Sequence, residues 1–171
     1  MGIVNVTPDS FSDGGRHFDA VRAIAHGRQL VEEGADLLDI GGESSRPGAQ
    51  SVSAEEEMRR VLPVIEALAG VGVPLSVDTV KPEVMRRAVA AGASVINDIA
   101  ALRAPGALEA AAASDAAVCL MHMQGEPRTM QDDPRYDNVV DEVRAHLEAR
   151  MAFAIRQGIA EHHGTSVIRF F

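Results

Sequence analysis

Short apolar runs alternate along the chain with longer stretches in which apolar residues recur at helical spacing. Runs this short and this uniformly apolar are typical of parallel strands that are covered on both faces. The pattern predicts strands at residues 3–5, 37–41, 74–78, 94–97 and 117–122.

Helical stretches lie between these strands, and glycines follow several of them. Ser53 with Glu56 three residues later forms a capping-box pattern, and Pro82 suits the first turn of a helix. The pattern predicts helices that begin at residues 19, 53, 82, 105 and 136 and end at about 33, 70, 92, 113 and 157.

The regular alternation of strand and helix predicts an α/β fold with a parallel sheet. Two architectures fit this order: a doubly wound open sheet and a (β/α)8 barrel of the TIM type. No glycine-rich phosphate loop follows the first strand, which argues against the dinucleotide-binding form of the open sheet. Polar residues follow nearly every strand instead, and a barrel places its chemistry at that edge. We therefore predict a barrel.

The predicted barrel is incomplete. A full barrel takes about 250 residues, whereas the sequence has 171. Residues 1–160 account for about five of the eight βα units, and we interpret residues 161–171 as an aberrant or disordered tail. Because an unclosed sheet keeps two unpaired edges, we expect the isolated chain to be unstable or to associate with itself.

The composition limits the classes of binding partner that the chain can have. The formal net charge of −9 argues against nucleic acid, which clustered Lys and Arg would bind. No apolar run approaches the ~18 residues of a membrane helix, and no signal peptide precedes the first strand. We therefore expect a cytoplasmic protein without a membrane partner.

The single cysteine, Cys119, lies in an apolar run, where a buried core thiol is more common than a nucleophile.

Polar side chains after the first two strands suit an anionic ligand. Asn5 ends the first strand, and its amide oxygen suits Mg²⁺ beside a phosphate-bearing substrate, or else satisfies neighbouring backbone groups. After the second strand, Gly41 and Gly42 allow a close approach of the backbone. Ser45 and Arg46 then offer a hydroxyl and a guanidinium to an anion or a carboxylate.

The later strands end in groups that suit a flat ring. Asp78 can accept two hydrogen bonds from the amide–amine edge of a heterocycle. Asp78 or Thr79 can also cap the next helix, and the two roles are compatible. Of Asn97 and Asp98, one faces the barrel interior and the other faces away, because side chains alternate along a strand. Met121 can pack on a flat ring, whereas we interpret His122 as a structural residue bonded to the backbone. These groups predict a site for a planar polar heterocycle that carries an anionic group.

Five strings of the sequence resemble, in the same order, the signatures of dihydropteroate synthases. The resemblance extends from residue 1 to about residue 160, and the ordered set of motifs makes it specific. The strings are NVTPDSFSDGG at 5–15, DIGGESSRPG at 39–48, SVDTVKP at 76–82, VINDI at 95–99 and CLMHMQG at 119–125.

The resemblance implies an enzyme that displaces diphosphate from 6-hydroxymethyl-7,8-dihydropterin diphosphate with the amine of p-aminobenzoate. It also implies Mg²⁺ as the cofactor, and a homodimer for full-length members of the family. By resemblance, Asp78 and Asn97 orient the pterin ring, Asp39 and Met121 lie near it, and Asn5 binds Mg²⁺. The implied mobile loop includes Thr7, Pro8, Asp9 and Ser10, and the implied p-aminobenzoate contacts are Ser45, Arg46 and Pro47.

Two other functions stay open. The family continues with a strand that ends in Asp, and later with a Lys, an Arg and a His that complete the site. Residues 162–171, which begin with His162 and His163, do not match that continuation. We therefore expect little activity from this chain, so a non-catalytic fragment is one alternative. A pterin-dependent methyltransferase on the same barrel is the other, although the first and last strings favour the synthase.

Overall fold

A computed structural model of the chain describes residues 1–7, 16–44, 51–125, 130 and 133–160. The predicted tail at 161–171 lies outside these residues. Within them, strands and helices alternate as the pattern predicts. The elements are β1 (Gly2–Asn5), α1 (Arg16–Glu32), β2 (Leu38–Gly41), α2 (Ala54–Leu68), β3 (Leu75–Asp78), α3 (Pro82–Ala90), β4 (Val95–Asp98), α4 (Ala107–Ala112), β5 (Ala117–Leu120) and α5 (Val139–Arg156).

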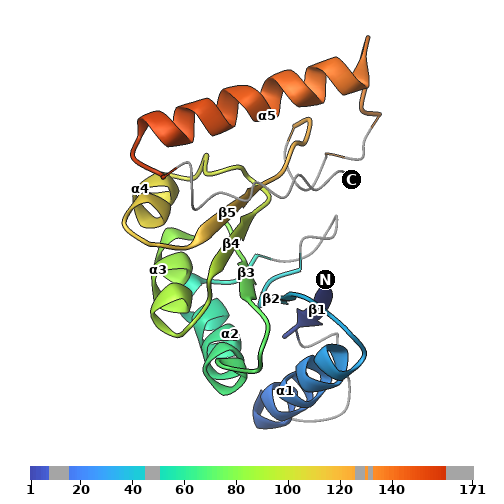
Figure 1. The fold of residues 1–171 in the computed structure, drawn as a ribbon, viewed down its shortest axis with the longest axis vertical. Coiled ribbons are helices and arrows are strands. Elements are labelled where there is room, and N and C mark those ends of the chain that lie inside the picture. The colour runs from blue at the N-terminus through green and yellow to red at the C-terminus, as the bar shows by residue number, and fades with distance from the viewer. Residues whose placement is uncertain (8–15, 45–50, 126–129, 131–132, 161–171) are drawn as a thin grey trace.

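The strands form one parallel sheet whose spatial order, β1-β2-β3-β4-β5, is the order of the chain. A doubly wound sheet reverses its strand order at a switch point, and the described strands do not. Figure 1 shows the helices following one another along the outside of this sheet. The arrangement is that of an incomplete (β/α)8 barrel, so the predicted fold class is confirmed. Among the described strands, β1 and β5 each have a single neighbour.

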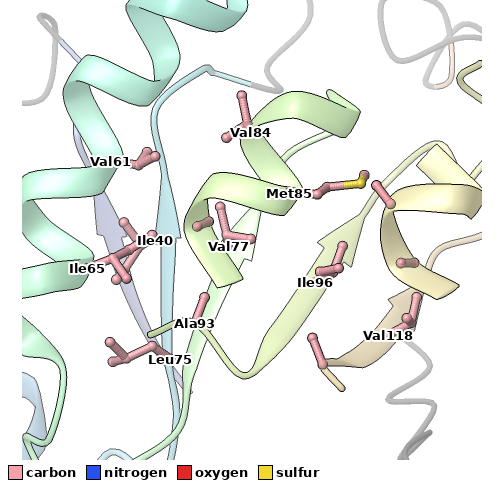
Figure 2. Packing of buried hydrophobic residues seen from close by; sticks show 14 of the residues in the cluster. Ile40, Val61, Ile65, Leu75, Val77, Val84, Met85, Ala93, Ile96 and Val118 are labelled. Carbon is pink, nitrogen blue, oxygen red and sulfur yellow. The ribbon is translucent and has the colours of Figure 1, made fainter. Parts of the chain in front are cut away.

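The core lies between the outer face of the sheet and the helices that cover it. Four fully buried residues pair directly with one another across neighbouring strands: Val4, Ile40, Val77 and Ile96. Figure 2 shows the side chains of Ile40, Val77 and Ile96 among those of α2 and α3. Burying an aliphatic side chain of this size contributes about 1.5–3 kcal/mol. Burial of this face against the helices therefore determines that the opposite face of each strand is the inner face of the sheet.

Helix α5 begins at Val139, three residues later than the sequence pattern predicts. Asn138 is its N-cap, and the side chain of Asn138 accepts a hydrogen bond from the backbone N–H of Asp141 at 3.3 Å. The Glu142 carboxylate accepts bonds from the N–H groups of Asp137 and Asn138 at 2.8 and 2.9 Å. These local bonds hold the preceding residues outside the helix.

Two histidines lie where α5 packs against the end of β5. Nε2 of His122 lies 3.2 Å from the Tyr136 hydroxyl, so the partner of His122 is a side chain and not the backbone group that we predicted. The His122 and His146 rings meet edge to face, with centroids 4.7 Å apart. One turn further along α5, Arg150 donates two hydrogen bonds to the Ala101 carbonyl, at 2.6 and 3.0 Å. These polar contacts add to the burial of Val143, Leu147 and Ala154 on the same helix.

None of the helices in the described part of the chain has the length and apolar character required to cross a membrane.

Both histidine rings are harder to protonate in the folded chain. Burial lowers the pKa of His122, and the Arg103 guanidinium lowers it further against a smaller, opposite effect of Glu142. Burial also lowers the pKa of His146, with further contributions from His122, Arg103 and Arg150. The unfolded chain therefore binds protons at these two positions more readily than the folded chain.

We expect the free energy of unfolding to fall as the pH drops below about 6.5, the ordinary pKa of histidine. The contribution is fully present above that pH because both rings are then neutral in either state. Urea unfolding between pH 8 and 5.5 measures it, and His146→Leu should flatten the pH dependence. His26→Gln, on helix α1, is the matched control. An unchanged slope in the His146 variant would contradict this account.

Candidate functional site

The sheet register aligns residues at the carboxyl ends of neighbouring strands in one row. Asn5 pairs with Gly41, Gly41 with Asp78, and Asp78 with Asn97. Residues that pair directly across a parallel sheet turn their side chains to the same face. Because Val4, Ile40, Val77 and Ile96 occupy the outer face, this row lies on the inner face at the carboxyl ends of the strands.

Gly41 forms the gap between two polar side chains of this row. A methyl carbon added to Gly41 would lie 3.7 Å from Oδ2 of Asp78 and 3.9 Å from Oδ1 of Asn5. The Asn5 side chain is exposed and that of Asp78 is half-buried. An amide oxygen and a carboxylate oxygen therefore face one another across a strand that presents no side chain between them.

Asp39 and Asn97 form a buried pair on the same face. Asp39 lies two residues before Gly41 on β2, so its side chain has the same orientation as the row. The amide nitrogen Nδ2 of Asn97 donates to Oδ2 of Asp39 at 3.0 Å. The two residues are only 2% and 5% exposed, and a carboxylate this buried requires such a partner. This bond fixes the orientation of the Asn97 amide.

Asp78 does not cap the helix that follows it. The N-cap of α3 is Lys81, which makes no side-chain capping bond. The hydroxyl of Thr79 instead accepts a hydrogen bond from the backbone N–H of Lys81 at 3.2 Å. Of the two predicted capping candidates, it is therefore Thr79 that bonds to the turn before α3, and the Asp78 carboxylate lies on the inner face of the sheet.

Asp98 lies on the opposite face from Asn97, as strand alternation requires. It is fully buried and accepts hydrogen bonds from the N–H groups of Ala100 and Leu102, at 2.7 and 2.9 Å. Burial raises the pKa of the Asp98 carboxyl, while these two backbone bonds act to lower it. Ala101 and Leu102 have left-handed backbone angles, with φ of 52° and 56°. Asp98 therefore holds a strained turn and takes no part in the row.

The end of β5 extends the inner face. Cys119 pairs with Asn97 in the register and is buried, in agreement with the sequence prediction. Met121, two residues further, is 4% exposed and has the same strand parity as Cys119. A thioether at this position suits contact with a flat ring.

Several predicted site residues lie outside the described part of the chain. Thr7 is described and buried, at 9% exposure. The other members of the predicted loop and the predicted p-aminobenzoate contacts are not described; they are Pro8, Asp9, Ser10, Ser45, Arg46 and Pro47.

Sequence reasoning missed a cluster of charged residues beside the row. The Lys81 ammonium lies 2.5 Å from a carboxylate oxygen of Glu43 and 2.5 Å from one of Glu57. Glu57 shares the buried stripe of α2 with Val61, Val64, Ile65 and Leu68. The sequence did contain a signal for this cluster, because Glu57 lies at helical spacing with apolar residues that are buried. A carboxylate in such a position is seldom buried without a partner.

The donor set around Gly41 suits a hard cation. In the described part of the chain, no three His, Cys, Asp or Glu side chains come together in a way that would hold a metal ion. Mg²⁺ needs fewer protein ligands than this, since it keeps several waters and often takes one or two carboxylates together with substrate phosphates. The oxygens of Asn5 and Asp78 that face Gly41 fit that pattern.

The chain matches a known family and several well-described proteins. The family model described as "Pterin binding enzyme" matches residues 1–163. The dihydropteroate synthase of Escherichia coli strain K12 is 54% identical over 162 residues, which are 94% of this chain and 57% of that protein. A structure of the Xanthomonas albilineans dihydropteroate synthase with 4-aminobenzoic acid is 56% identical, with a TM-score of 0.87, over 99% of this chain and 62% of that one.

A structure of the Yersinia pestis dihydropteroate synthase in a sulfonamide drug complex is 50% identical, with a TM-score of 0.88, over 96% of this chain and 60% of that one. The chain therefore spans less than two thirds of the length of these relatives. Their agreement with the fold, with the five ordered motifs and with the family model leads to one conclusion. This chain belongs to the family of pterin-binding enzymes.

Proposed function

We propose that the chain carries the pterin-binding part of a dihydropteroate synthase. Such an enzyme joins 6-hydroxymethyl-7,8-dihydropterin diphosphate to p-aminobenzoate and releases diphosphate. The observation that supports this most strongly is the inner-face row beside the buried Asp39. Asn5 and Asp78 end two strands of this row, and Asn97 lies one residue before the end of a third. Because the chain spans 57% of the Escherichia coli enzyme, the activity of the whole protein belongs to this proposal.

The polar edge of a pterin matches the row. Its ring N–H and its amino group are two donors on one edge, and the Asp78 carboxylate can accept both. The Asn97 amide is already oriented by its 3.0 Å bond to Asp39, so little rotational freedom is lost when a ligand binds. Met121 would contribute an apolar surface for the face of the ring. Buried polar groups of this kind reject rings that leave them unpaired.

The Asn5 side of the row suits the diphosphate. We assign Asn5 as the protein ligand of Mg²⁺, with Asp78 facing the same gap across Gly41. When bound, the cation would supply neutralisation of the negative charge on the diphosphate.

The reaction itself requires positioning more than proton transfer. The arylamine is a neutral nucleophile whose nitrogen attacks the methylene carbon of the pterin. The carbon–oxygen bond breaks, its electron pair leaves with diphosphate, and the amine proton passes to solvent. Asp78 and Asn97 hold the ring that delocalises the developing positive charge. Fixing two reactants in this orientation is itself a large source of rate enhancement.

The remaining assignments rest on the motif resemblance. We assign Ser45, Arg46 and Pro47 to the p-aminobenzoate site, and Thr7, Pro8, Asp9 and Ser10 to a loop over the substrate. Homodimer formation by the full-length protein and a cytoplasmic location stay predictions. Diphosphate release in the presence of p-aminobenzoate separates a synthase from a fragment that binds pterin without turnover. Transfer of a methyl group from a pterin donor would instead support the methyltransferase.

Asp78→Asn should weaken the binding of 6-hydroxymethylpterin about 10- to 100-fold, because a charge-assisted pair of hydrogen bonds is lost. Isothermal titration of the full chain measures the change. Asp36→Asn is the matched control, since Asp36 is an exposed carboxylate just before β2. Equal affinity in the two variants would rule out Asp78 as the ring-binding group.

Removing Mg²⁺ with EDTA should weaken the binding of the pterin diphosphate and leave that of the unphosphorylated pterin unchanged. Asn5→Ala should abolish most of this metal dependence, because it removes the amide oxygen that faces Gly41. The measurement is a pair of titrations with and without Mg²⁺ for each ligand. A metal effect of equal size in wild type and variant would place the cation elsewhere.

Substitutions at the two adjacent glycines should separate binding from stability. A methyl group on Gly41 would make ordinary contacts, 3.6 Å from Cβ of Asp78, so Gly41→Ala should change stability by less than about 0.5 kcal/mol and still obstruct the ligand. On Gly42 it would lie 2.8 Å from Cγ1 of Val61 and 3.2 Å from the Glu57 carbonyl, so Gly42→Ala should cost about 1–3 kcal/mol. Urea unfolding and pterin titration of both variants test the contrast.

A further inference from the structure

The chain beyond β5 carries a residue of the proposed ring site past the end of the sheet. Among the described strands, β5 pairs with β4 alone, and the last pair of that register is Asp98 with Leu120. Met121, which we assign to the face of the ring, is the next residue along the chain. The ladder with β4 therefore ends one residue before the side chain that would meet the ligand.

The alternation of the strand continues past this point. Met121 and Met123 are buried, at 4% and 9% exposure. The residues that alternate with them, His122 and Gln124, bond instead to the segment that precedes α5. One side of this stretch is therefore apolar and buried, and the other side is a line of attachment.

Two side chains make that attachment. Nε2 of His122 lies 3.2 Å from the hydroxyl of Tyr136, which is fourteen residues later in the sequence. The side-chain amide of Gln124 donates to the Arg135 carbonyl at 2.6 Å and accepts from the Arg135 N–H at 3.0 Å. Consecutive residues of one segment thus hold alternate residues of the other.

The Tyr136 hydroxyl is the one hydrogen-bond partner of the His122 ring among the described residues, since Nδ1 of that ring is buried and has none there. The ring also packs edge to face on His146, with centroids 4.7 Å apart. Burial lowers the pKa of His122, so the ring is neutral near physiological pH. A neutral imidazole can donate to the hydroxyl or accept from it.

The segment that holds His122 is itself anchored. Tyr136 packs against the hydrophobic core. The two N–H groups that follow it donate to the Glu142 carboxylate, at 2.8 and 2.9 Å. On α5, Arg150 donates to the Ala101 carbonyl in the turn after β4, at 2.6 and 3.0 Å. The support for His122 therefore comes from the core and from the strand next to β5.

From these contacts we infer that His122 is a positioning residue that holds Met121 against the face of the heterocycle. The inference rests on the proposed function, which assigns Met121 to that face. The sheet register holds Asp78 and Asn97 at the edge of the ring. His122 holds the surface on which the ring lies, and it acts from the opposite side of the chain without touching either substrate.

Tyr136→Phe tests the attachment because it removes the hydroxyl and keeps the aromatic ring. At about pH 7.5, where both histidine rings are neutral, the affinity of the full chain for 6-hydroxymethylpterin should fall about three- to tenfold, the range of one net hydrogen bond. Ser114→Ala is the matched control. It removes another half-buried hydroxyl, whose 2.8 Å bond to the Ala111 carbonyl lies before β5, and it should leave the affinity within about twofold of wild type.

A double-mutant cycle with Met121→Ala separates positioning from general stability. If His122 acts through Met121, adding Tyr136→Phe to the Met121→Ala variant should change pterin affinity by less than about twofold. Losses that add in the double variant would overturn the inference, because Tyr136 would then affect the ligand by a route that does not include Met121.

A ligand-free measurement follows Met121 directly. NMR spectra of the unliganded chain, labelled at its seven methionine methyl groups, give one signal per methionine, and the Met121→Ala variant identifies that of Met121. The Met121 signal should shift in Tyr136→Phe, because the thioether loses its fixed surroundings. It should keep its wild-type position in Ser114→Ala.

These outcomes distinguish the inference from the proposed function. If the wild-type chain does not bind the pterin, the proposed function fails, and the Met121 methyl signal alone decides whether His122 positions Met121. If wild type binds the pterin and Tyr136→Phe matches it in affinity and in the Met121 signal, His122 has no positioning role.

Discussion

The register of the parallel sheet is the constraint on which the site depends. Each strand contributes one apolar face to the core, and burial of residues such as Ile40 and Val77 selects which face that is. A shift of a strand by one residue would bury its polar positions and expose its apolar ones. Asn5, Asp78 and Asn97 are distant in the sequence and share one row because the hydrophobic effect fixes the opposite side of the same strands.

The polar groups of the molecule divide into two sets with different tasks. Those on the inner face lie at the carboxyl ends of the strands, with the bond between Asp39 and Asn97 as their internal support. Those away from it are consumed by the fold. Asp98 holds the turn after β4, and Glu57 is paired with Lys81. Residue type alone does not separate the two sets, because Asn97 and Asp98 are both polar and belong to different sets. Their alternate positions along the strand separate them, since successive side chains point to opposite faces.

Much of this arrangement could be predicted from the sequence. Apolar runs and helical spacing located every described strand and helix, because periodicity reports directly which side chains are buried. The inner-face positions followed from the rule that barrels place polar groups at strand ends. The sequence pattern could not show the contacts of Lys81 with Glu43 and Glu57, because these join residues as far as 38 positions apart. Nor could it show that His122 meets Tyr136 and His146, because that contact depends on how α5 packs.

The sequential strand order also has a consequence for biosynthesis. Each βα unit finds its sheet neighbour in the unit made just before it, so no described strand waits for a distant partner to be synthesised. Domains begin to fold while the ribosome is still adding residues at their C-terminal end. A nascent chain of this topology can add its polar strand ends one at a time, starting from Asn5. The inner-face row is then assembled before the last described helix, α5, leaves the ribosome.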